Sequence, residues 1–146
     1  MGKGFKSGVY VIPDAGIPDK IAKKIEIVKL WENASPSSDF AAQTIALDLA
    51  GYDFVIMSAN FSASSEVGKG GYHALAAVGG SGRFYVIGNI STNTEMRMYN
   101  RQAIVTETGV EFGDTISHKF DEASYTTANN YAIPLVIYGI KGVIKE

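Results

Sequence analysis

Apolar and polar residues alternate along most of this chain with a period of two, which differs from the period of an α-helix. Ile45, Leu47 and Leu49 are separated from one another by single polar or small residues. This is the pattern of a β-strand with one buried face. Ala50-Gly51 then interrupts the alternation, and glycine tolerates the positive φ of a tight reversal. The pattern therefore predicts a β-hairpin that turns at this glycine.

The segment after this turn is apolar on both of its faces. In an extended chain, Phe54 and Ile56 point to one side, whereas Val55 and Met57 point to the other side. A strand with two apolar faces belongs in the middle of a packed structure. We therefore predict that the segment beginning at Phe54 is a central strand.

Shorter alternating segments follow at close spacing along the rest of the chain. Gly79-Gly-Ser-Gly82 is a turn signal that predicts a second hairpin, and residues 83–112 read as a meander. In the strand that ends at Tyr99, we expect Met96 and Met98 to face the core and Tyr99 to face outward. The other predicted strands are residues 25–32, 72–78, 83–87, 94–99, 102–106, 110–112, 115–120 and 132–141.

About 8–10 short strands without crossover helices predict an all-β fold, an antiparallel β-sandwich of jelly-roll-like type. Residues 17–31 are ambiguous, because Ile17, Ile21 and Ile25 also fall at helical spacing. We favour a short helical or irregular lead, and a trimerising helical stub stays open as an alternative. The predicted organisation is a flexible lead or stalk remnant over residues 1–24, followed by a β-sandwich domain over residues 25–146.

Composition excludes several classes of protein. A chain of 146 residues with 46% hydrophobic and 19% charged residues is long enough and apolar enough for one packed domain. The net charge of −2 gives no electrostatic reason to expect nucleic acid as a partner. The absence of cysteine excludes disulfides and thiolate chemistry. No apolar run reaches the roughly 18 residues of a membrane helix, so we expect no membrane partner.

No residue pattern indicates catalysis. His73 and His118 are the only histidines, and neither accompanies a nucleophile motif. The acidic residues are too dispersed for a calcium loop. Residues 66–71 superficially resemble a phosphate-binding loop, but the lysine is followed by Gly70 where that motif has serine or threonine. We expect no catalytic residue, no metal, no cofactor and no enzymatic activity.

Tyrosine is the residue type that offers a ligand surface. The chain has 8 tyrosines, and a tyrosine ring can stack on a sugar while its hydroxyl forms hydrogen bonds. Tyrosine is also common in cores and at subunit interfaces, so each position has that alternative reading. The residues that we select as candidate ligand contacts are Tyr72, His73, Tyr125 and Tyr131.

Several short motifs follow one another in a characteristic order. They are Leu-Trp at 30–31, Phe-Ala-Ala-Gln at 40–43, Leu-Ala-Gly-Tyr-Asp at 49–53, Val-Thr-Glu-Thr-Gly-Val-Glu-Phe-Gly at 105–113, and a terminal segment at 129–141 that ends in Tyr-Gly-Ile-Lys. This order resembles the C-terminal module of tail fibres and other minor structural proteins from phages and prophages of Gram-positive, often gut, bacteria. The resemblance covers about residues 25–142.

The resemblance implies a fold and a setting, and it carries no binding residues over to this chain. It implies a compact β-sandwich, often homotrimeric, at the tip of a fibre or on the surface of a phage particle. The expected location is therefore the virion, after synthesis in the bacterial cytoplasm. The expected partners are copies of the same chain, other virion proteins and a saccharide of the host cell surface.

Three functions remain open on the sequence alone. The first is a virion structural protein whose head domain attaches to a host saccharide, which predicts a trimer. The second is a carbohydrate-binding module of a secreted protein, which predicts a monomer with exposed aromatic residues along one sheet face. The third is a small glycan hydrolase, which predicts a cleft with paired carboxylates.

Overall fold

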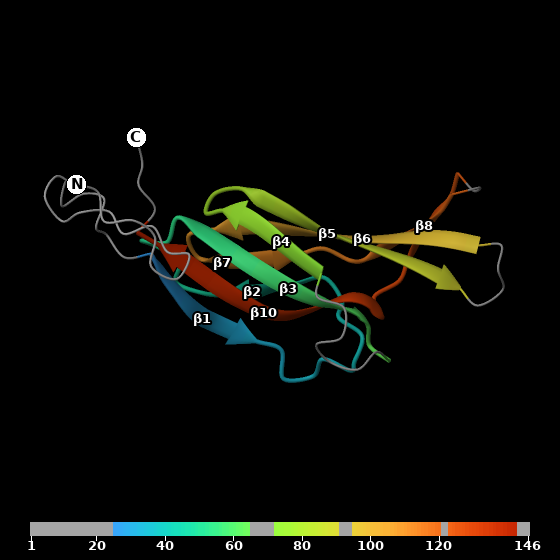
Figure 1. Cartoon of the computed structure of the whole chain (residues 1–146), viewed down its shortest axis with the longest axis horizontal. Helices are drawn as coiled ribbons and strands as arrows, with labels where there is room; N and C mark the ends of the chain where they lie inside the picture. The colour runs from blue at the N-terminus through green and yellow to red at the C-terminus, as the bar shows by residue number, and fades with distance from the viewer. Residues whose placement is uncertain (1–24, 65–71, 91–94, 121–122, 143–146) are drawn as a thin grey trace, which may run out of the picture.

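The computed structural model describes residues 25–64, 72–90, 95–120 and 123–142 (Figure 1). These residues form ten strands in two antiparallel sheets and no helix, so the predicted all-β sandwich is confirmed. No helix that could cross a membrane occurs in the described part of the chain. The predicted lead over residues 1–24 lies outside the described residues, and so do residues 66–71, which superficially resemble a phosphate-binding loop.

The first sheet has four strands in the order β1-β10-β3-β4. Its strands are β1 (Glu26–Glu32), β10 (Tyr131–Lys141), β3 (Phe54–Ser62) and β4 (Tyr72–Ala77). The strand β3 lies between β10 and β4, as its two apolar faces predict. Pro134 of β10 is part of a bulge against β3, which accommodates a residue that cannot donate a backbone hydrogen bond.

The second sheet is built around β6 (Glu95–Thr106), which is the longest strand. One edge of β6 pairs with β5 (Ser81–Ile90) over the full length of β5. The other edge pairs first with β8 (Ile116–Lys119) and then with β7 (Gly109–Phe112). The outer neighbours of β7 and β8 are β2 (Gln43–Ala46) and β9 (Tyr125–Thr127).

Aromatic rings fill much of the space between the two sheets. The rings of Phe40 and Phe112 meet edge to face with centroids 5.5 Å apart, and the ring of Trp31 lies 6.3 Å from that of Phe40. Phe84 of β5 stacks on Phe112 of β7 at 6.4 Å, across the intervening strand β6. Edge-to-face and offset contacts of this kind are favourable beyond the area that they bury. The Leu-Trp and Phe-Ala-Ala-Gln motifs therefore supply core residues.

The predicted hairpin through Gly51 is wrong, because its two strands belong to different sheets. The N–H groups of Leu47 and Leu49 donate to the carbonyls of Thr108 and Glu107 in the second sheet. The N–H of Asp53 donates to the carbonyl of Ile140 in the first sheet. The segment is thus a crossover, although it keeps the predicted turn with positive φ at Gly51 and the predicted alternation of burial at Ile45, Leu47 and Leu49.

The second predicted hairpin, at residues 79–82, is a crossover as well. β4 pairs with β3 in the first sheet, whereas β5 pairs with β6 in the second sheet. The N–H of Val78 donates to the carbonyl of Asp53, and the N–H of Gly79 donates to that of Val105. Gly79 has a φ of 87°, a value that glycine adopts without strain, so the chain can pass from one sheet to the other here.

Two further expectations failed within β6. Residues 94–99 and 102–106 were expected as separate strands, but they form one strand with Asn100 and Arg101 inside it. The predicted facing is also reversed, because Tyr99 is 2% exposed and points into the core. In the sequence, the charged residues Glu95 and Arg97 precede Tyr99 at a spacing of two residues. This alternation predicts a solvent-exposed side of the strand and therefore misplaces Tyr99.

Arg101 is fully buried between the two sheets. Its guanidinium donates to the carbonyl oxygens of Ala132 (2.9 Å), Gly113 (2.6 Å) and Phe40 (2.7 Å), and more weakly to that of Tyr131 (3.5 Å). Burial lowers the pKa of Arg101 to about 10, so the group stays charged at neutral pH. One side chain thus connects β6 to β10 and to the loop before β2.

Candidate functional site

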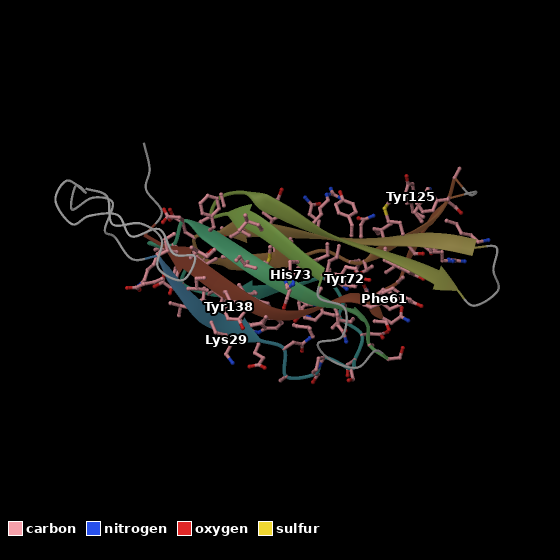
Figure 2. The ribbon with its side chains drawn as sticks, in the orientation of Figure 1. Lys29, Phe61, Tyr72, His73, Tyr125 and Tyr138 are labelled. Atoms are coloured by element: carbon pink, nitrogen blue, oxygen red, sulfur yellow. The ribbon has the colours of Figure 1, made fainter. Side chains whose placement is uncertain are left out.

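The four candidate ligand residues lie in three separate places. Figure 2 shows Tyr72 and His73 over the middle of the sandwich and Tyr125 at the far end of the second sheet. Tyr131 contacts the same ring as Tyr72, which is Phe61. The structure therefore brings only Tyr72 and Tyr131 together.

Tyr72 and Tyr131 belong to an aromatic cluster at one end of the core. The ring of Phe61 lies 6.4 Å from that of Tyr72, 5.5 Å from that of Tyr131 and 6.3 Å from that of Tyr99. Tyr99 and Tyr131 stack with centroids 3.8 Å apart and planes 10° apart. Because these rings pack on one another, we assign Tyr72 and Tyr131 to the core rather than to the candidate site.

Tyr99 gives this cluster a measurable pH dependence. Burial, together with a hydrogen bond to Tyr131, raises the pKa of Tyr99 from its ordinary value of 10 to about 12. A raised folded-state pKa means that stability is complete below pH 10 and is lost as the pH rises towards 12. For one proton, the free energy of unfolding falls by at most about 1.4 kcal/mol per pH unit in this window.

Urea unfolding on either side of pH 10 measures this loss. In the Tyr99→Phe variant, we expect a lower stability at neutral pH and a shallower decline above pH 10, because the titrating hydroxyl is absent. An equally steep decline in the variant would assign the alkaline loss to another group.

His73 lies on the exposed outer face of the first sheet, opposite Ser58 of β3. A groove of about 230 Å³ begins beside it, with Ser58, Val136 and Tyr138 among its lining residues. At the border of the groove, Lys29 Nζ bonds Glu32 Oε2 at 2.7 Å. This hydrogen bond raises the pKa of Lys29. Most of the groove wall is apolar.

Tyr125 is on a part of the second sheet that extends beyond the first sheet. In Figure 1, the distal ends of β5 and β6, with β8 beside them, continue past the end of the four-stranded sheet. We call this part the arm. Tyr125 is 66% exposed, and it lies on the outer face of the second sheet, since the neighbouring row through Tyr99 and Ser117 is buried in the core.

The ring of Tyr125 stacks on a histidine of β8. It stacks on His118 with centroids 4.7 Å apart and planes 28° apart, because the two residues are direct cross-strand partners. His118 also meets Phe120 edge to face at 6.4 Å, and Phe120 is 60% exposed. Two large exposed rings thus flank one half-buried histidine.

A further exposed tyrosine lies on the same outer face. Tyr85 is 55% exposed and pairs with Asn100 of β6. Asn100 is two residues along β6 from Met98, so the two share a face, and Met98 pairs with His118. Three strand spacings separate β5 from β9, a width of about 14 Å. We define the arm surface as Tyr85, Met98, His118, Phe120 and Tyr125.

Polar groups border the arm surface on β5 and β6. Arg83 Nη1 donates to Asn100 Oδ1 at 3.5 Å, and Arg83 Nη2 donates to Gln102 Oε1 at 3.3 Å. These groups are exposed or partly exposed, so a ligand can compete for their hydrogen bonds. Stacking surfaces beside amide and guanidinium donors suit a polyhydroxylated ligand.

Sequence reasoning found Tyr125 but missed His118, Phe120 and Tyr85 as its neighbours. His118 and Phe120 are two residues apart, so they share a face of any strand through them. That signal was present in the sequence. The pairing of β8 with β9 and with the first half of β6 could not be predicted from the sequence, and this pairing brings the residues of the site together.

The described residues contain no group of three or more histidine, cysteine or acidic side chains that could hold a metal ion. A depression of about 410 Å³ beside two turns is lined by residues that include Asp48 and Glu107. Asp48 Oδ1 accepts the N–H of Ala50 in its own turn, so we assign this carboxylate to turn geometry.

The fold and this surface define an antiparallel β-sandwich with an exposed aromatic arm. Comparison of the chain with protein-family models, with curated proteins and with solved structures finds no match. The function is therefore argued from the site itself and from the motif resemblance.

Proposed function

We propose that this protein is a non-enzymatic attachment module of the phage tail-fibre type, and that its arm surface binds a saccharide of the host cell surface. The observation that carries the proposal is the exposed stack of His118 and Tyr125 beside Phe120. Large aromatic rings rarely stay exposed in groups unless they contact a partner. The exposed faces of these rings suit the apolar C–H face of a sugar ring.

The virion setting rests on the motif resemblance over about residues 25–142. In that setting, the chain is a structural protein of a phage or prophage particle, made in the bacterial cytoplasm. It assembles as a homotrimer and contacts other virion proteins. The exposed arm then extends away from the sandwich, where a host saccharide can reach it.

One observation favours a second candidate function. Exposed aromatic residues along one sheet face are the feature expected of a carbohydrate-binding module of a secreted protein. Both candidates bind a saccharide through the same surface, but they differ in assembly. A particle mass of three chains favours the fibre module, and a mass of one chain favours the secreted module.

Binding to a glycan array, followed by titration of the best saccharide, tests the proposed site. We expect Tyr125→Ala to weaken binding about tenfold or more, because it removes the largest exposed ring. Tyr125→Phe keeps the stacking face and should retain most of the affinity.

A matched control is Ile104→Ala, which removes an exposed apolar side chain from the same sheet face outside the arm surface. This control should bind like the unmodified protein. Unchanged binding by Tyr125→Ala, or an array on which the unmodified protein binds no saccharide, would contradict the proposed function.

A further inference from the structure

Every second residue of the first sheet points away from the core, and most of these outward residues are apolar. The strand register places them in three rows of four across β1, β10, β3 and β4. Eight of the twelve are apolar. The rows are Ile27, Ile140, Phe54 and Ala77; Lys29, Tyr138, Ile56 and Leu75; and Glu32, Val136, Ser58 and His73.

Away from the arm, the outer face of the second sheet is more polar than that of the first sheet. One of its rows contains Thr44, Glu111, Ile104 and Ser81, so three of its four residues are polar. A polar outer face is normal for a sandwich in water. On the first sheet, in contrast, Leu75 is 61% exposed and Ile27 is 62% exposed. The same chain thus follows the rule on one sheet and departs from it on the other.

We propose that the outer face of the first sheet packs against copies of this chain around a rotation axis parallel to its strands. Rotation about such an axis does not move a row along the strand direction, so equivalent rows of two copies meet. It also brings the β1 border of one copy to the β4 border of the next. This holds for two copies face to face and for three copies around a central axis. The proposal concerns assembly and does not depend on saccharide binding.

The charges at the two borders fit this arrangement. Glu32 on β1 and His73 on β4 stand at opposite ends of the same row. Rotation therefore places Glu32 beside His73 of the partner subunit, where a carboxylate and an imidazole are complementary. Lys29 and Leu75 end the middle row, so the aliphatic stem of the lysine covers the leucine of the next copy.

The size of the surface is close to what a stable interface needs. The groove of about 230 Å³ adds Asn33, Pro36 and Leu135 to the twelve residues of the rows. These fifteen residues are about three-quarters of the lower end of the roughly 20–30 residues a side of a standard interface. The groove also offers a recess for a side chain of the partner.

Sedimentation equilibrium or light scattering over a range of protein concentrations tests the proposal with a matched pair of variants. The unmodified protein should have the mass of two or three chains. Leu75→Glu introduces a charge on the apolar face and should raise the dissociation constant at least about tenfold. Ile104→Glu makes the same change on the outer face of the second sheet and should leave the mass unchanged.

An exchange of charges tests the axis itself. Glu32→Lys and His73→Glu should each weaken association, and the double variant should restore it, because the two positions meet across the interface. This result does not depend on whether Leu75→Glu folds. A single-chain mass at every concentration, equal effects of Leu75→Glu and Ile104→Glu, or no rescue in the double variant would overturn the proposal. Saccharide binding by the arm, measured on the same samples, separates this failure from a failure of the proposed function.

Discussion

Arg101→Met lowers the free energy of unfolding by an expected 3–5 kcal/mol or so, which would be the largest effect of any single side chain here. Methionine keeps the length of the side chain but donates no hydrogen bond. The carbonyl oxygens of Ala132, Gly113 and Phe40 would then lose a charged donor in the interior. A buried acceptor without a donor costs about 1–3 kcal/mol, so three of them explain the size of the effect.

Chemical denaturation followed by tryptophan fluorescence measures this change, because Trp31 lies in the same core. Arg101→Lys keeps the charge but lacks the planar fork of donors, and it should cost about 2 kcal/mol. Arg83→Met is the control, since Arg83 is an exposed arginine on the neighbouring strand and should change stability by less than about 0.5 kcal/mol. Equal stabilities of Arg101→Met and Arg83→Met would contradict the structural role of the buried guanidinium.

The positions of the strands were predictable because a half-buried strand imposes a period of two on its own sequence. The strand predicted at residues 25–32 is β1, and the segment from Phe54 is the interior strand β3. The strand predicted at residues 110–112 lies within β7, which begins at Gly109. Each of these features depends on residues that are close in sequence.

The pairing of the strands was not predictable by the same reasoning. A glycine turn between two alternating segments looks the same whether the chain returns to the same sheet or crosses to the other one. The choice at Gly51 is made by distant groups, since Leu49 bonds the turn after β6 and Asp53 bonds β10. Leu49 is fully buried, so it fills space between the sheets instead of continuing a strand.

Arg101 shows a second limit of pattern reading. An arginine between Asn100 and Gln102 looks like a polar interruption, and it was expected to separate two strands. In the structure, Arg101 lies in the middle of β6, because backbone carbonyls from other segments accept its protons. A buried charge of this kind is stable only when its partners surround it, and those partners are set by the complete fold.

The candidate site was predictable only as single residues. Tyr125 was selected for its ring, but a stacking surface needs neighbours on the same face. His118 becomes its partner through the pairing of the two short strands β8 and β9. This face is the outer face of the second sheet, because Met98, the partner of His118, lies next to the core residue Tyr99. Local sequence does not encode which short strands pair to build such a face.

Gly109→Ala should lower the free energy of unfolding by about 3 kcal/mol or more, for two reasons that act together. Gly109 has a φ of 154°, which residues with a Cβ rarely adopt. An added Cβ would also overlap the carbonyl oxygen of Ile45 on the adjacent strand, and this backbone atom belongs to the β2–β7 pairing. Relief of the overlap therefore requires β2 to move away from β7.

The matched control for this variant is Gly51→Ala. Gly51 has a φ of 87°, so alanine is strained there as well, but an added Cβ would meet no atom within 4 Å. Only the backbone cost of about 1–2 kcal/mol is then expected. Thermal unfolding of the two variants separates the cost of the overlap from the cost of the backbone conformation. The Gly109→Ala variant should melt several degrees below the Gly51→Ala variant. Equal melting temperatures would mean that β2 can shift without cost, and that the edge of the second sheet is held less firmly than its four backbone pairs with β7 indicate.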